Sequence, residues 1–295
     1  MPGERYGVDD AEVDIERVRL GMLAEARDPK SFEMLERVGI AEGMHCLELG
    51  AGAGTVSAWM AEQVGADGRV MSTDIDLQFH NDMPDNVIVR QHDIENDKPL
   101  PAEHFDIVHA RAVMQHVPTR EAVMGKLIDC LKPGGWLVIE DGNMMEFAAQ
   151  TLPEPYGPIH QTIAGATHEE WREPNCGLLV AGWMRDRGLT DIDIAGDVWA
   201  MRPGEPSGEW WFLALERAIP TMVEFGLVDG AAGERALEQV REPGFVMMSP
   251  TSIATGEHAT SAASVSSSIS SVMTGVDRSP CSERLEWGKV HCCFR

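Results

Sequence analysis

Short apolar runs alternate with amphipathic stretches from about residue 40 onward. Residues 44–50 (MHCLELG) form an apolar run that ends in glycine, as in a buried parallel strand, and apolar side chains then recur at helical spacing through 55–65. Four further apolar runs are predicted strands: 69–76, 86–94, 105–114 and 136–141. A helical pattern at 119–132 precedes the last of them and ends in Pro-Gly-Gly. Strands alternating with helices indicate an α/β fold with a doubly wound, mostly parallel sheet.

The segments on either side of this core have a looser pattern. Residues 13–39 are predicted to be helical, with a break and restart at Asp28-Pro29 because proline disrupts a helix interior. Beyond residue 143 we expect helices and two more strands, which would bring the sheet to seven. The helices are placed at 160–171, 176–188 and 208–241, and the strands at 190–203 and 244–254. These helices would cover the carboxyl ends of the strands, where open α/β sheets bind ligands.

This pattern divides the chain into four regions. Residues 1–40 form an N-terminal helical segment and 41–142 a ligand-binding core, while 143–254 supply lid helices and the last strands around the substrate. Residues 255–295 form a tail with the serine-rich stretch TSAASVSSSISSV. Such a stretch cannot bury enough apolar surface to offset the entropy of ordering it, so we expect a disordered tail.

Composition narrows the possible partners. A formal net charge of −24 opposes binding to phosphate backbones, so we expect no nucleic-acid partner. No apolar stretch is long enough to span a bilayer and the acidic N-terminus lacks a signal-peptide core, which predicts a cytoplasmic protein. The six cysteines form no Cys-x-x-Cys pair and no cluster with zinc-ligand spacing, so no metal site is expected.

The strongest chemical signal is the loop Glu48-Leu-Gly-Ala-Gly-Ala-Gly54, which follows the first strand and precedes a helix. Glycine permits a sharp turn and the close approach of a ligand to the backbone. The dinucleotide fingerprint G-x-G-x-x-G is not met, because Thr55 stands where its third glycine or alanine should be. A phosphate-binding P-loop is disfavoured too, because no Gly-Lys-Ser/Thr follows.

Further motifs follow this loop in order. Asp74 ends the second strand, where a carboxylate can accept both hydroxyls of a ribose, and Asp93 ends the third. Residues 105–108 (FDIV) form the fourth strand, and 131–135 (LKPGG) lead into the fifth. Over residues 40–141 this series resembles the class I S-adenosylmethionine-dependent methyltransferases. It is most similar to the small-molecule branch of quinone-biosynthesis and natural-product enzymes.

The resemblance implies S-adenosylmethionine as the cofactor and a Rossmann-like fold. Glu48 would sit beneath the methionine end, Asp74 would bind the ribose, and Asp93 would hold the amino edge of the adenine. Residues after the fourth strand, His109 among them, would line the floor near the methionine moiety. The complete predicted set of cofactor-binding residues is Glu48, Gly50, Ala51, Gly52, Asp74, Ile75, Asp93, Ile94, Ala110 and Arg111.

No catalytic residue is assigned. A general base is needed only for a nucleophile that is protonated at neutral pH, and the candidates are His109, His116, His160 and His168. Glu140 and Asp141 end the fifth strand and could contact substrate or support the site from behind. Large apolar side chains recur after residue 143 and would pack the lid on the sheet or line an apolar pocket: Met144, Met145, Phe147, Tyr156, Trp171, Trp183, Trp210, Trp211 and Phe212.

The expected function is therefore methylation of a small, partly hydrophobic molecule on oxygen, nitrogen or carbon in a biosynthetic pathway. The alternatives are a non-methylating enzyme or a non-catalytic S-adenosylmethionine-binding protein on the same fold. A methyltransferase acting on nucleic acid or protein is disfavoured by the acidic charge and by the predicted lid. The sequence leaves the oligomeric state open, with a homodimer as one candidate.

Overall fold

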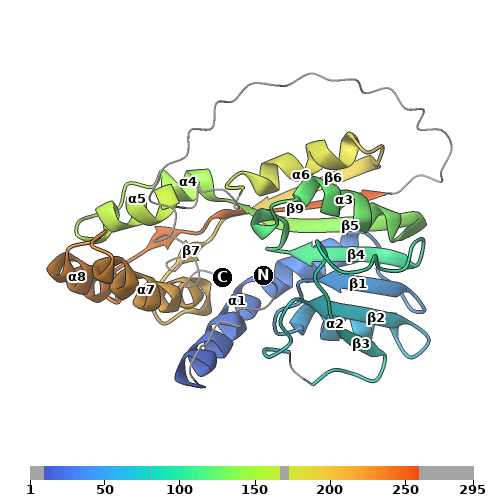
Figure 1. Cartoon of the computed structure of the whole chain (residues 1–295), viewed down its shortest axis with the longest axis horizontal. Coiled ribbons are helices and arrows are strands. Elements are labelled where there is room, and N and C mark those ends of the chain that lie inside the picture. The colour runs from blue at the N-terminus through green and yellow to red at the C-terminus, as the bar shows by residue number, and fades with distance from the viewer. Residues whose placement is uncertain (1–9, 81, 167–172, 259–295) are drawn as a thin grey trace.

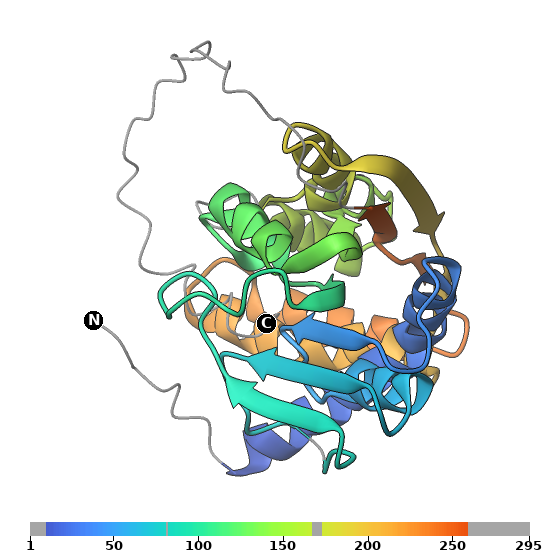
Figure 2. The ribbon, with the colours of Figure 1, turned by 90° about the vertical axis from the view of Figure 1, so that its right-hand side faces the viewer.

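A seven-stranded sheet forms the centre of the protein in a computed structural model that describes residues 10–80, 82–166 and 173–258 (Figure 1). The strand order is β3-β2-β1-β4-β5-β9-β6. The strands are β1 (His45–Leu49), β2 (Arg69–Asp74), β3 (Val87–Gln91), β4 (Phe105–Arg111), β5 (Leu131–Asn143), β6 (Thr190–Asp197) and β9 (Thr251–His258). Strands β1 to β5 are parallel, as Figure 2 shows for β1, β2 and β3, whereas β9 runs antiparallel to both of its neighbours. The predicted α/β fold is confirmed.

Helices cover both faces of the sheet. On one face α1 (Asp10–Arg37) and α2 (Thr55–Val64) pack against β1 and β2 through a cluster that includes Leu35 and Met60. On the other face α3 (Arg120–Asp129) and α6 (Cys176–Arg185) pack through Leu127 and Val180. Strands β1 and β4 are therefore buried on both sides, which explains their nearly continuous apolar sequences.

The remaining helices form a separate unit beside the sheet (Figure 1). They are α4 (Met144–Ala148), α5 (Tyr156–Ala166), α7 (Pro206–Glu224) and α8 (Gly230–Val240). Their apolar sides build a second core that contains Tyr156, Phe212 and Leu215. Two short paired strands, β7 (Ala200–Met201) and β8 (Met247–Met248), lie where the chain enters and leaves α7 and α8. Helix α1 runs between this unit and the sheet and packs along α7.

Two sequence predictions about these elements were wrong. Helix α1 is continuous through Pro29 rather than broken there. Proline removes one backbone hydrogen bond, but residues on both sides of it, Ala24 and Leu35 among them, are buried, and this packing holds the helix together. The last strand of the sheet also begins and ends later than predicted.

That last strand, β9, runs from Thr251 to His258, so the sheet extends four residues into the segment assigned to the tail. Its pairing with β5 and β6 supplies the stabilisation that local composition does not reveal. The rest of the predicted tail lies outside the described residues, and the division into four regions stays a prediction. Among the described residues, every helix is too short or too polar to cross a bilayer.

Candidate active site

The loop after β1 is shaped by its glycines. Gly50, Gly52 and Gly54 have φ values of 68°, 56° and 77°, a region that other residues adopt at a cost. The amides of Gly50 and Ala51 donate to the Thr73 carbonyl oxygen of β2 at 2.8 and 3.0 Å. A Cβ at Gly50 would lie 2.3 Å from Val113 Cγ2, whereas no protein atom lies within 4 Å of a Cβ built at Gly52. The loop is thus packed on one side and open at Gly52.

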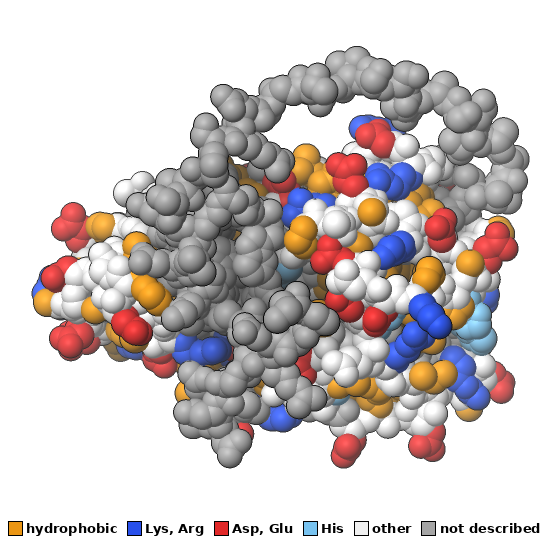
Figure 3. All heavy atoms as spheres, in the orientation of Figure 1, with side chains coloured by type: hydrophobic (Ala, Val, Ile, Leu, Met, Phe, Trp, Pro, Cys, Tyr) orange, Lys and Arg blue, Asp and Glu red, His pale blue; other side chains and the backbone are white. Residues whose placement is uncertain are grey.

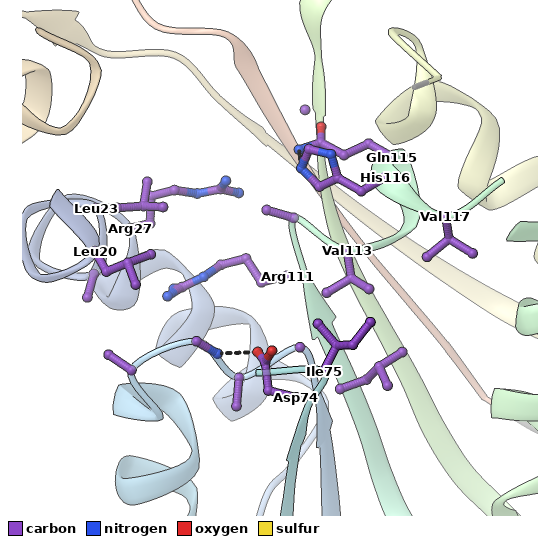
Figure 4. A pocket seen from close by; sticks show the side chains of 18 of the residues that line it. Leu20, Leu23, Arg27, Asp74, Ile75, Arg111, Val113, Gln115, His116 and Val117 are labelled. Atoms are coloured by element: carbon purple, nitrogen blue, oxygen red, sulfur yellow. Dashed lines mark hydrogen bonds between the residues drawn. The ribbon is translucent and has the colours of Figure 1, made fainter. Parts of the chain in front are cut away.

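Asp74 holds this loop from the neighbouring strand (Figure 4). Its Oδ2 accepts the Gly52 N–H at 2.8 Å and its Oδ1 accepts the Asp76 N–H at 3.0 Å. Burial raises the pKa of Asp74, although these two backbone donors favour the carboxylate and oppose the shift. The side chain is therefore positioned by the loop and still borders the cavity beside it.

A cavity of about 560 Å³ opens above the carboxyl ends of the strands. The glycine loop, Asp74 and Ile75 line one end of it. The other end is lined by apolar side chains of α1 and of the helical unit: Leu20, Leu23, Met144, Ile163, Trp210 and Trp211. The cavity thus lies at the edge of the sheet where open α/β folds generally bind their ligands.

Asp93 and Ile94 also line this cavity, in the loop after β3. The Asp93 carboxylate accepts hydrogen bonds from its own loop: from the Glu95 N–H at 2.9 Å and from Asn96 Nδ2 at 2.8 Å. Burial would raise the pKa of Asp93, but these donors lower it. Asp93 is thus a loop-capping carboxylate as well as a lining residue.

Three predicted residues lie behind the cavity rather than in its wall. Glu48, His109 and Ala110 are buried and do not line it, whereas Leu49, Arg111, Ala112 and Val113 do. The reason is the alternation of side chains along β1 and β4, which turns Glu48 and Ala110 into the sheet's packed faces. A direct contact of Glu48 or Ala110 with a cofactor stays a prediction without geometric support.

The buried His109 connects two acidic residues of different strands. Its Nε2 lies 2.8 Å from Glu140 Oε1 on β5, and its Nδ1 lies 3.7 Å from Glu48 Oε1 on β1. Burial alone would lower the pKa of His109, but the two carboxylates outweigh it and raise the pKa to about 9. Glu48 also accepts a hydrogen bond from Ser57 at the start of α2. This network fixes the strand ends that carry the glycine loop.

The candidate bases are separated by the fold. His116, in η1 (Met114–His116), lines the cavity, and its Nε2 lies 3.1 Å from Gln115 Nε2. His160 does not, because it is buried in the helical unit with Nε2 2.7 Å from the Phe147 carbonyl oxygen. His168 lies outside the described residues. Glu140 and Asp141 are buried behind the lining, and burial raises the pKa of Asp141 to about 7.

Sequence reasoning missed the contribution of α1. Arg19, Leu20, Leu23 and Arg27 line the cavity from this helix. Leu20 and Leu23 are three residues apart, Leu23 and Arg27 four, and Arg19 and Arg27 eight, which places these side chains on one face of a helix. Nothing in the local sequence indicates that the two arginine side chains turn toward a cavity, because that depends on what packs against the helix. Of the large apolar side chains after residue 143, Met144, Trp210 and Trp211 reach the cavity, while Phe147, Tyr156 and Phe212 pack the helical core.

Comparisons with known proteins agree with this geometry. Residues 23–172, half of the chain, match the family model described as a methyltransferase domain. Methyltransferase str2 of Strobilurus tenacellus is 33% identical over 114 residues, which cover 38% of this chain and 40% of that protein. The chain thus matches about two fifths of that relative's length.

Other relatives cover more of the chain or share its fold. Methyltransferase GfsG of Streptomyces halstedii is 28% identical over 77% of this chain and 80% of its own. A ubiquinone/menaquinone biosynthesis C-methyltransferase, UbiE of Vibrio parahaemolyticus, is 28% identical over 43% of this chain and 49% of its own. A solved chain from the Haloferax volcanii complex of the Trm112 activator with a methyltransferase has a TM-score of 0.50 and 17% identity, covering 86% and 97% of the two chains. This chain therefore belongs to the methyltransferase-domain family.

Proposed function

We propose that this protein transfers the methyl group of S-adenosylmethionine to an oxygen, nitrogen or carbon atom of a small, partly hydrophobic molecule in a biosynthetic pathway. The observation that carries this proposal is the composition of the cavity. One end has the family's glycine loop and ribose-binding carboxylate, and the other end has leucine, methionine and tryptophan side chains. Cofactor and acceptor can therefore occupy one enclosed space.

The residues at the first end suit the cofactor. The open backbone face at Gly52 leaves room for the ligand, and Asp74 offers a carboxylate at the end of β2. Ile75 and Ile94 add apolar surface on either side of the proposed adenine position. The other predicted contacts that reach the cavity wall are Gly50, Ala51, Asp93 and Arg111.

A bound S-adenosylmethionine supplies a methyl group already activated by its sulfonium. The protein's own task is to align the acceptor and to exclude water, which can contribute on the order of 7–11 kcal/mol to the barrier reduction. Leu20, Leu23 and Trp211 give the acceptor end an apolar wall suited to both tasks. We assign no general base, and His116 is the one predicted histidine among the described residues that lines the cavity.

Charge and similarity both favour a small-molecule acceptor over a nucleic acid. The net charge is −24, and basic side chains on the visible face are scattered among acidic ones (Figure 3). One relative is named for quinone biosynthesis. A homodimer and a cytoplasmic location stay predictions, which light scattering and cell fractionation would test.

Methyl transfer can be tested with S-adenosylmethionine carrying an isotope-labelled methyl group and a panel of hydrophobic phenols, quinols and amines. We expect labelled product and S-adenosylhomocysteine in equal amounts, detected by mass spectrometry. Cofactor consumption without a labelled product would instead support a non-methylating enzyme. Cofactor binding with no turnover across the panel would support a non-catalytic binding protein.

A further inference from the structure

Among the residues that the structure describes, three arginine side chains line the cavity of this otherwise acidic protein: Arg19, Arg27 and Arg111. Two of them form direct ion pairs with carboxylates. Arg19 pairs with Glu16, with its Nε 2.8 Å from Glu16 Oε2, and Arg111 Nη2 lies 2.8 Å from Asp28 Oδ1. The third, Arg27, forms no ion pair with any residue that the structure describes, and its recorded hydrogen bond goes to the Ser252 hydroxyl.

Three nearby acids, Glu140, Asp141 and Asp28, favour the charged form of Arg27, but none of them forms an ion pair with it. Glu140 is engaged by His109 at 2.8 Å, and Asp28 is engaged by Arg111. Burial raises the pKa of Asp141 to about 7, so this side chain is only partly ionised near neutral pH. Burial and the adjacent Arg111 lower the pKa of Arg27, but a guanidinium stays protonated in proteins. A partly buried cation without a direct ion pair is costly, and an anionic ligand in contact with it would relieve that cost.

The position of Arg27 assigns this ligand to the acceptor end. Ser252 on β9 lies opposite Gly142 of β5, whereas Asp74 ends β2. Three strands separate β2 from β9, so the two points are roughly 19 Å apart at about 4.8 Å per strand spacing. The methionine arm of a cofactor whose ribose lies at Asp74 is shorter than this. Figure 4 shows Arg27 extending from α1 into the cavity toward Gln115 and His116.

We propose that the methyl acceptor carries a carboxylate and that Arg27 binds it, while the apolar wall holds the rest of the molecule. This inference rests on the proposed function and adds a substrate class to it: flat, mainly apolar carboxylic acids. Arg27 would act as a specificity-determining residue, because an arginine matches the two oxygens of a carboxylate and hydrogen bonds between charged groups are the stronger kind.

The test measures binding by calorimetry with S-adenosylhomocysteine at saturation. Benzoate, cinnamate and 2-naphthoate are each compared with the corresponding uncharged primary amide. We expect at least one acid to bind the native protein about ten-fold or more tightly than its amide, and Arg27→Gln to abolish that preference. Arg27→Lys, which keeps the charge but loses the fork of donors, should retain part of it. The matched control is Arg37→Gln on the same helix, because Arg37 is exposed and pairs with Asp193 away from the cavity.

Cofactor binding separates the alternatives. Unchanged affinity of Arg27→Gln for S-adenosylhomocysteine shows that the variant is folded and that Arg27 does not hold the cofactor, so a lost preference for the acid is assigned to the acceptor. Methylthioadenosine lacks the amino-acid arm of the cofactor. If Arg27→Gln lowers the affinity for S-adenosylhomocysteine but not for methylthioadenosine, Arg27 binds the cofactor carboxylate and the inference is wrong. It is equally wrong if no acid is preferred over its amide. Failure of the native protein to bind S-adenosylhomocysteine would instead overturn the proposed function.

Discussion

His109 illustrates how single residues support the site from behind. It is completely buried and lies between a glutamate of β1 and a glutamate of β5, on either side of its own strand β4. A buried imidazolium between two carboxylates is stabilised by both, and removing it leaves two buried carboxylates without their shared partner. We therefore expect His109 to contribute to the stability of the sheet's central strands rather than to touch the substrate.

This role predicts a particular pH dependence of stability. The folded-state pKa of His109 is raised from 6.5 to about 9, so its stabilisation is complete below pH 6.5 and is lost as the pH rises toward 9. The raised pKa of Asp141, about 7, lowers stability between pH 3.8 and 7 and adds little change above that. Thermal unfolding measured from pH 7 to 9 should thus show a falling melting temperature.

The free energy of unfolding of His109→Gln should be lower than that of the native protein by about 3 kcal/mol or more at pH 7. Above pH 7 its melting temperature should change less with pH. His104→Gln is the matched control, because His104 is exposed and outside this network. If the melting temperatures of the native protein and of His109→Gln fall in parallel as the pH rises, the proposed positive charge on His109 is contradicted.

The sequence allowed some of these residue positions to be predicted and not others. Asp74 and the glycines were predictable because their roles depend on backbone position at the end of a strand. The partner of Glu48 could not be predicted, because its contact with His109 depends on which strands are neighbours and on their register. Likewise, Arg27 meets Ser252 across 225 residues of sequence, a contact that no local pattern encodes.

At the scale of elements, the β1–α2 turn combines backbone strain with an open face. Gly52 and Gly39 both have positive φ, 56° and 86°, and a Cβ at either would meet no protein atom within 4 Å. They differ in place, because Gly52 lines the cavity and Gly39 follows the end of α1. Comparing substitutions at the two glycines therefore distinguishes the effect of backbone strain on stability from the effect of a blocked ligand site on binding.

We expect Gly52→Ala and Gly39→Ala to lose similar stability, about 1–2 kcal/mol each, from the left-handed backbone conformation. Only Gly52→Ala should weaken S-adenosylhomocysteine binding, by about ten-fold or more, because its methyl group occupies the ligand side of the loop. Chemical unfolding and calorimetry measure the two effects. Equal ligand affinity in both variants would show that the cofactor does not approach Gly52.

Helix α1 shows the limit of local rules at this scale. Its proline predicted a break, yet packing on the sheet and on α7 keeps it continuous across Pro29. Strand β9 shows the same limit, because its pairing with β5 and β6 extends it beyond the apolar run that predicted a strand. In both cases tertiary contacts outweigh the local signal.

At the scale of the whole molecule, the packed sheet and the packed helical unit meet around one cavity. The sheet and its helices provide the cofactor end, the helical unit provides tryptophan and isoleucine side chains, and α1 contacts both. The sequence predicted the first of these parts well, because alternating strands and helices have a strong periodic signal. It could not predict how the helical unit sits on α1, because that depends on which apolar faces meet in space.

The most direct test of this account is the affinity for S-adenosylhomocysteine measured by calorimetry for the native protein, Asp74→Asn and Asp76→Asn. The two aspartates are two residues apart, but only Asp74 lines the cavity and anchors the glycine loop. We predict one binding site per chain, affinity reduced about ten-fold or more by Asp74→Asn, and little change for the exposed Asp76→Asn. No binding to the native protein, or equal affinity in all three proteins, would contradict the account.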